Sequence, residues 1–260
     1  MSYSPILLDG GVTGWHFLKK TAERQKAVFE KGHAMASDRA HLQKNAQKVS
    51  SVDELFSDRR LLRITLTAFG LEGDLSKSAL IRQVIESDPN DRNSLANRLS
   101  DDRYVDLAKK LRPLVTGEAL SSTTITSLLS EFNRQSFEAA IGGESESMRI
   151  ALVGQRLLRE LSDNMQSDRA NWYTILGTPP LRKLFEGFLN LPSSFTNLDI
   201  VRQQEIIQNR VHGQLGISSF AELSDVDKQE RIIEGFLLQE QLKEFDVLGS
   251  HSIALAILQR

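Results

Sequence analysis

Residues 93–107 read NSLANRLSDDRYVDL, in which a short apolar segment is followed by an acidic group and then by a longer amphipathic segment. Ser100 and Asp101 stand at the position of a helix N-cap, where a side-chain oxygen accepts a hydrogen bond from a free backbone amide. Asp102 follows in the first turn, where its negative charge suits the positive end of the helix. The stretch therefore predicts a joint between two helices.

The same residues also have a catalytic interpretation, because paired carboxylates carry out acid–base chemistry in enzymes. Arg103 and Asp106 lie three residues apart in the predicted helix, and we expect them to pair on one of its faces. Arginines beside carboxylates keep those carboxylates ionised, whereas a general acid needs a raised pKa. We therefore interpret the cluster as structural.

Similar helix boundaries recur earlier in the chain. Ser51 and Glu54 fit a capping box, in which each side chain accepts a hydrogen bond from the other residue's backbone amide. Ser57 and Asp58 then precede an apolar run with helical spacing, and Gly70 stands where that helix is expected to stop. These signals predict a succession of helices joined by short caps.

Apolar residues at helical spacing extend this pattern over most of the chain. The first such stripe begins at Trp15 and is interrupted by Gly32, and a weakly amphipathic helix is expected over residues 34–49. Further helices are predicted over residues 75–85, 124–140, 147–161, 197–215 and 226–245. The alternation of apolar and polar residues that is typical of strands is not sustained anywhere. The sequence predicts an all-α fold, a compact bundle of short and medium helices.

Glycine and proline set the expected domain organisation. Residues 1–14 contain Pro5 and three glycines, and they are predicted to form a flexible arm. Residues 15–260 then form a single helical domain, in which any subdivision is expected near residues 114–122. The pair Gly142-Gly143 is interpreted as the C-cap of the helix before it.

Composition excludes several classes of function. The chain has 32 basic and 34 acidic residues and a formal net charge of -2. It therefore has no overall positive potential that would attract a phosphate backbone, and no nucleic-acid binding is expected. It contains no cysteine, which removes thiol catalysis, disulfides and iron–sulfur clusters. No apolar run approaches the roughly 18 residues that a membrane span requires. The N-terminus also lacks the basic region of a cleaved signal peptide.

Two carboxylate–histidine pairs are the candidate metal ligands. Glu30 and His33, and likewise Asp38 and His41, have the spacing that places two ligands on one helix face. A di-iron bundle would aim such pairs into an apolar core, whereas these pairs stand in a polar segment interrupted by glycine. We therefore expect no metal or other cofactor. His16 stands apart in the sequence and is expected to be a packing or surface residue.

Aromatic residues supply candidate contacts for a protein partner, because aromatic side chains anchor interfaces. One group is Trp15, Phe17 and Leu18 at the start of the first helix, and the other is Trp172 and Tyr173. The alternative is that these side chains fill the core, since large aromatic side chains most often pack in the protein interior. We favour the core for Trp172 and expect the proline pair that follows it to begin a helix.

Several segments together carry a resemblance to a known family. They are GWHFLKKTAERQKAVFEK (14–31), DRRLLRITLTAFGLE (58–72), SLANRLSDDRY (94–104), FEAAIGGESESMRIAL (137–152), WYTILGTPPLRKLFEGFLNLP (172–192) and SIALAILQ (252–259). The chain resembles a bacterial family of unknown function that occurs mainly in flagellated alphaproteobacteria, with members often encoded among flagellar genes. The resemblance implies a cellular setting at the flagellum, and it carries no catalytic residues.

These observations lead to an expected function. The chain is expected to be a non-enzymatic helical protein that binds other proteins, in particular flagellar components. The resemblance leaves two roles open: a basal-body or rod-region component that is exported without a cleaved signal peptide, or a cytoplasmic accessory factor in assembly. The rival hypothesis is an enzyme with a metal site built from carboxylates and histidines. The sequence leaves the partner and the oligomeric state open.

Overall fold

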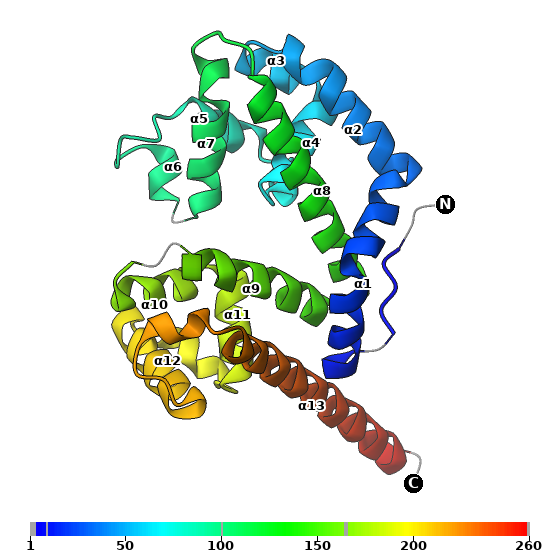
Figure 1. Cartoon of the computed structure of the whole chain (residues 1–260), viewed down its shortest axis with the longest axis vertical. Coiled ribbons are helices and arrows are strands. Elements are labelled where there is room, and N and C mark those ends of the chain that lie inside the picture. The colour runs from blue at the N-terminus through cyan, green and yellow to red at the C-terminus, as the bar shows by residue number, and fades with distance from the viewer. Residues whose placement is uncertain (1–3, 9, 100, 164–165, 259–260) are drawn as a thin grey trace. The chain divides into compact units, whose positions relative to one another are not determined.

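The computed structural model describes residues 4–8, 10–99, 101–163 and 166–258, with side chains through residue 245. The described residues form helices and no strand, so the predicted all-α fold is confirmed (Figure 1). The helices pack as two units. Unit 1 is built from residues 23–140 with the first residues of the chain, and unit 2 is built from residues 6–22 and from residue 141 onward.

Two of the boundaries between the units fall inside helices, in α1 (Gly11–Lys31) and in α8 (Ser122–Glu144), and a third falls between Pro5 and Ile6. The segment 114–122, where the sequence placed any subdivision, lies within unit 1. Helix α1 begins inside the predicted N-terminal arm, of which residues 4–8 and 10 have no regular structure. Helix α8 continues through Gly142 and Gly143, so the interpretation of these glycines as a C-cap was wrong. Helix propensity is a weak prior that tertiary packing overrides.

Unit 1 gathers most of the short helices. Besides parts of α1 and α8 it contains α2 (His33–Asn45), α3 (Val52–Ser57), α4 (Arg59–Ala68), α5 (Ser78–Glu86), α6 (Leu95–Arg98) and α7 (Asp102–Val115), with 3-10 turns at Ala46–Lys48 and Glu72–Asp74. Helix α4 lies in the core of this unit, because its residues 61, 62 and 64–68 are all buried. A helix that buries nearly all of its faces needs neighbours on every side, and α2, α3 and the Glu72–Asp74 turn contact α4.

The predicted joint at residues 93–107 is present between α6 and α7. Asp101 is the N-cap of α7, and its carboxylate accepts a hydrogen bond of 3.1 Å from the Arg103 amide. The Arg103 guanidinium also binds the Asp101 carboxylate and donates to the Gly70 carbonyl at 2.6 Å. Arg103 therefore ties the start of α7 to the end of α4, whereas the sequence predicted a pair with Asp106. Ser100 lies outside the described residues.

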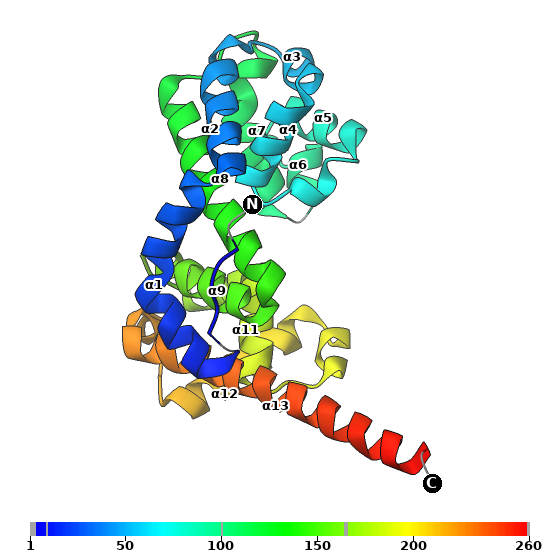
Figure 2. The ribbon, with the colours of Figure 1, turned by 90° about the vertical axis from the view of Figure 1, so that its right-hand side faces the viewer.

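Unit 2 contains the longer helices. Besides parts of α1 and α8 it contains α9 (Glu146–Asp163), α10 (Asp168–Gly177), α11 (Pro179–Phe188), α12 (Ile200–Leu215) and α13 (Val226–Leu258), with 3-10 turns at Ser193–Asn197 and Phe220–Ser224. Helices α9, α11 and α13 pack against one another. Figures 1 and 2 both show the last turns of α13 running out beyond the other helices of this unit.

Trp172 organises the core of unit 2. Its ring is fully buried and meets the rings of Phe185, His212 and Phe220 edge-on, with centroids 6.2, 5.9 and 4.9 Å away. Edge-to-face contacts at such separations are favourable for aromatic rings. The favoured interpretation of Trp172 as a core residue is thus confirmed, and α11 begins at Pro179 as the proline pair predicted.

Candidate functional site

The predicted contact residues at the two aromatic groups are mostly covered. Trp15 and Leu18 are 0% exposed, as is Trp172, so these three side chains belong to the core of unit 2 and offer no surface to a partner. Phe17 and Tyr173 are half-buried. The apolar spacing of the two predicted groups reflects packing inside the unit. A helical stripe marks a buried face whether the neighbour belongs to the same chain or to another.

The predicted carboxylate–histidine pairs are engaged by other partners. Asp38 accepts hydrogen bonds of 2.7 Å from Arg60 and 2.6 Å from Arg63. Burial alone would raise the pKa of Asp38, but the hydrogen bonds and charges of Arg63 and Arg60 together hold that pKa below its ordinary value. His41 meets Asp58 at 2.7 Å between Nε2 and Oδ2.

The other two candidate ligands are also separated. Glu30 lies 3.7 Å from the Arg39 guanidinium, and His33 is exposed at the start of α2. Within the described part of the chain, Glu30, His33, Asp38 and His41 do not come together as a group of metal ligands. The structure therefore uses the acidic members of these pairs to join the first helices of unit 1.

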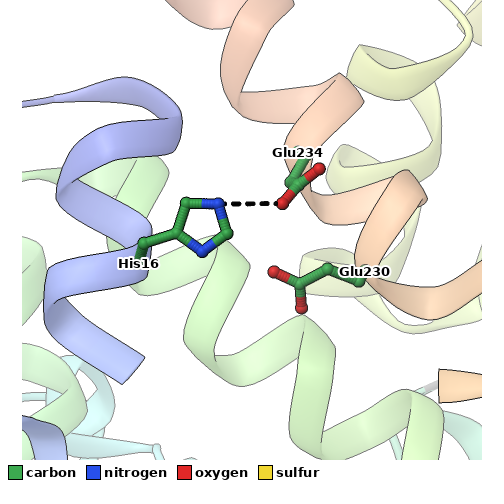
Figure 3. A group of neighbouring side chains, drawn as sticks. All are labelled: His16, Glu230 and Glu234. Atoms are coloured by element: carbon green, nitrogen blue, oxygen red, sulfur yellow. Dashed lines mark ion pairs between the residues drawn. The ribbon is translucent and has the colours of Figure 1, made fainter. Parts of the chain in front are cut away.

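A different group of ligand-type side chains does come together in unit 2. His16 of α1 faces Glu230 and Glu234 of α13 (Figure 3). The two glutamates are four residues apart, so they share one face of α13. His16 Nε2 lies 3.1 Å from Glu234 Oε1, and the three potential ligand atoms all lie within 4.8 Å of one another. This arrangement can hold a cation between the two helices.

Two further residues of α1 position Glu230. The Trp15 indole Nε1 donates a hydrogen bond of 2.8 Å to Glu230 Oε1, and the Lys19 ammonium binds the same oxygen. The Trp15 ring is buried, so its bond to Glu230 is fixed by the core of the unit. The His16 side chain is 50% exposed, Glu234 33% and Glu230 20%, which leaves the group accessible to solvent.

Little in the sequence points to this group. The spacing Glu230-x-x-x-Glu234 places two carboxylates on one helix face, but such spacing is common in charged helices. His16 was expected to be a packing or surface residue, and its partners lie more than 200 residues away along the chain, as the Trp15–Glu230 separation of 215 residues illustrates. Only the packing of α1 against α13 brings these side chains together.

An open pocket of about 480 Å³ adjoins the group. Glu234 lines it together with Val12, Phe188, Arg231 and Leu238, so the lining combines charged and apolar side chains. Glu234 thus faces both the pocket and His16. A small ligand or a side chain of another molecule can approach the Glu234 carboxylate from this side.

An apolar surface continues along α13 from the pocket. Leu238, Leu242 and Phe245 are 49%, 49% and 62% exposed, and their spacing places them on one face of the helix. We refer to these three residues as the α13 stripe. The sequence beyond it, IALAIL at residues 253–258, is also apolar, although its side chains lie outside the described part of the chain. None of the helices that the structure describes is long and apolar enough to cross a membrane.

Asp74 and Asp101, which bind the first residues of α7 at its joint with α6, have pKa values typical of structural carboxylates. Tyr104 donates a hydrogen bond of 2.6 Å to Asp74, and this bond raises the pKa of Tyr104 to about 12. Hydrogen bonds from Lys77 and Tyr104 lower the pKa of Asp74, and Arg103 lowers the pKa of Asp101 in the same way. Asp74 and Asp101 are therefore held ionised, and for Asp101 this agrees with the sequence-based interpretation.

Asp106 behaves differently from its neighbours. Burial raises its pKa, which agrees with the finding that Arg103 binds Asp101 and Gly70 instead. Burial is the usual cause of a raised carboxyl pKa and is not evidence of catalysis by itself.

Comparison with known proteins supports the fold and the family. A crystal structure of a protein from Agrobacterium tumefaciens is similar, with a TM-score of 0.70, 22% sequence identity, and coverage of 93% of this chain and 99% of that chain. At this identity the likeness shows the fold. None of the curated proteins matches the chain. The family described as "Protein of unknown function (DUF1217)" matches residues 68–229, which is more than half of the sequence, and the chain therefore belongs to this family.

Proposed function

We propose that the chain is a non-enzymatic helical protein that binds other proteins of the bacterial flagellum, either as a basal-body or rod-region component or as an assembly accessory factor. The observation that carries the binding role is the α13 stripe, three large apolar side chains exposed on one helix face. The flagellar setting rests on the family resemblance seen in the sequence.

The α13 stripe favours a partner for a thermodynamic reason. Burying a large apolar side chain contributes about 1.5–3 kcal/mol, so covering the remaining half of Leu238, Leu242 and Phe245 gains roughly 1 kcal/mol for each. Helical segments shorter than about 12–15 residues are marginal when isolated in water, and the last turns of α13 have few neighbours within unit 2. A partner that lies along this face stabilises both the apolar side chains and the helix.

The spacing of the stripe indicates the kind of partner. Positions separated by four and three residues form the anchor pattern of a helix that packs against another helix or lies in a groove. We therefore propose that the partner presents an apolar helical surface of a flagellar protein. A second copy of this chain is the alternative occupant, and it would appear as a concentration-dependent dimer in light scattering.

The experiment compares cell fractions of the native host by immunoblotting. Purified hook–basal bodies, cytoplasm and culture medium are probed for the wild-type protein and for the double variant Leu242→Ser/Phe245→Ser. The control is Lys243→Gln on the same exposed helix, which removes only a surface ion pair with Glu240. In parallel, a photo-reactive residue at position 242 identifies the neighbouring protein inside the cell.

Each outcome distinguishes the proposed roles. Wild-type protein at a fixed ratio in hook–basal bodies, with loss in the double variant and not in the control, supports a structural component. Recovery only from the cytoplasm, with cross-linking to a flagellar protein, supports an accessory factor. The proposal fails if the wild-type protein contacts no flagellar protein in either test, or if the double variant retains the same contacts.

A further inference from the structure

We propose that His16, Glu230 and Glu234 form a binding site for a divalent transition-metal ion, and that Zn²⁺ suits the ligands well. The proposal concerns a site that the protein-binding role does not use, so the two stand or fall separately. It rests on side chains from α1 and α13 that converge within unit 2 (Figure 3).

The geometry needs only small side-chain movements to accept the ion. Zn²⁺ holds nitrogen and oxygen ligands at about 2.0–2.2 Å, which places neighbouring donor atoms about 3.4 Å apart in a tetrahedron. His16 Nε2 and Glu234 Oε1 are already 3.1 Å apart, and all three ligand atoms lie within 4.8 Å of one another. Because Trp15 holds Glu230 in place, rotation of the more exposed His16 and Glu234 side chains is what closes the remaining distance.

The chemistry of the ligands selects the class of ion. Imidazole nitrogen suits zinc and its transition-metal neighbours, whereas calcium and magnesium prefer oxygen ligands alone. Two carboxylates add negative charge that a dication neutralises. The exposure of His16 and Glu234 leaves further coordination positions open to water, and Glu234 also lines the adjoining pocket. The site therefore has three protein ligands and an accessible face.

Two neighbours of Glu230 affect the ion in opposite directions. The Trp15 indole fixes one carboxylate oxygen through its hydrogen bond, and such outer contacts orient metal ligands. The Lys19 ammonium binds the same oxygen, so its positive charge competes with the ion. We therefore expect the site to bind Zn²⁺ less tightly than the same three ligands would without Lys19.

Direct titration tests the site. The full-length protein is treated with a chelator, dialysed, and titrated with Zn²⁺ against a chromophoric competitor. We expect one equivalent to bind to the wild-type protein. His16→Ala and Glu234→Gln should each weaken binding at least about 10-fold, the lower bound for loss of contacts even outside the ligand set. Lys19→Met should strengthen binding, because it removes the competing charge.

His33→Ala is the matched control, since His33 is an exposed histidine that stands outside the group. It should bind Zn²⁺ as the wild-type protein does. Circular dichroism without metal checks that each variant is folded. If the His16→Ala variant is not folded, Glu234→Gln serves as the test. Wild-type binding below one equivalent, or equal affinity in wild type and both ligand variants, overturns the proposal. An increase with Lys19→Met that disappears in Lys19→Met/His16→Ala assigns the effect to this site.

Discussion

Gly187 of α11 lies directly against the ring of Phe236 on α13. The Phe236 side chain is only 2% exposed. The reverse contact is also present, because Gly235 of α13 lies against Phe188 of α11, and a Cβ at Gly235 would stand 2.6 Å from Phe188 Cδ2. Each helix therefore places a glycine where the other places an aromatic ring. This reciprocal arrangement allows α11 and α13 to approach closely, and α13 in turn carries Glu230, Glu234 and the α13 stripe.

Adding a methyl group at Gly187 should destabilise unit 2. We expect Gly187→Ala to lower the free energy of unfolding by about 1–3 kcal/mol, the usual cost of overpacking a filled core. Urea denaturation followed by circular dichroism measures the change. Gly213→Ala in α12 is the control: a Cβ there meets nothing within 4 Å, so alanine should leave stability unchanged or raise it by up to about 1 kcal/mol. Equal stability of Gly187→Ala and wild type would show that the Phe236 ring moves aside freely.

The joint between α6 and α7 should depend on the cap at Asp101. Asp101→Ala removes both the hydrogen bond to the Arg103 amide and the ion pair with its guanidinium, so we expect a loss of about 1–2 kcal/mol in the free energy of unfolding. Asp101→Asn keeps an oxygen that can cap the helix, and it should lose less. Urea denaturation of both variants separates the cap from the charge. If the two variants are equally unstable, the ion pair rather than the cap holds the joint.

The Asp74–Tyr104 hydrogen bond should make stability fall at alkaline pH. The pKa of Tyr104 is raised from 10.0 to about 12 in the folded protein, so folding disfavours the ionised phenol. The stabilisation is complete below pH 10 and is lost as the pH rises toward about 12. Urea denaturation at about pH 9 and about pH 11 measures the free energy of unfolding at each pH. The loss between the two pH values should be smaller for Tyr104→Phe than for wild type. Tyr173→Phe is the control, and an identical difference in Tyr104→Phe and wild type would contradict the assignment.

Asp38 should contribute to stability at neutral pH and lose that contribution in acid. Its pKa lies below the ordinary value in the folded protein: burial opposes this shift, but the hydrogen bonds and charges of Arg63 and Arg60 outweigh it. A lowered folded pKa gives stabilisation that is present above the unfolded pKa and is lost as the pH falls through the folded pKa. Asp38→Asn should therefore be less stable than wild type at neutral pH, and the difference should shrink in acid. Thermal melts of both proteins from neutral to acid pH check the prediction, and a stability difference that stays constant with pH would refute it.

Much of the local structure was predictable from sequence because it depends on neighbouring residues. Asp101 and Ser51 cap helices through bonds to amides two and three residues away, Pro179 begins α11, and Gly70 follows the end of α4 with a positive φ of 68°. Such signals were less reliable at the ends of two long helices. Helix α8 continues through Gly142 and Gly143, and α13 runs past Phe245 to Leu258.

The candidate site was not predictable, because its parts are distant in the chain. Apolar periodicity indicated that Trp15 and Leu18 lie on one helix face, but it did not show whether that face meets the chain's own core or a partner. The same limit applied to His16, whose partners Glu230 and Glu234 belong to the last helix.

The sequence by itself determined the all-α class and many helix ends, including the Asp101 cap of α7. Caps, prolines and charged neighbours act over a few residues, and a single chain segment carries all the information they need. Only the tertiary structure decided which helices pack together, and so which side chains meet. The packing of α1 against α13 and the close approach of Gly187 to Phe236 depend on shape complementarity between distant segments, which no local pattern encodes.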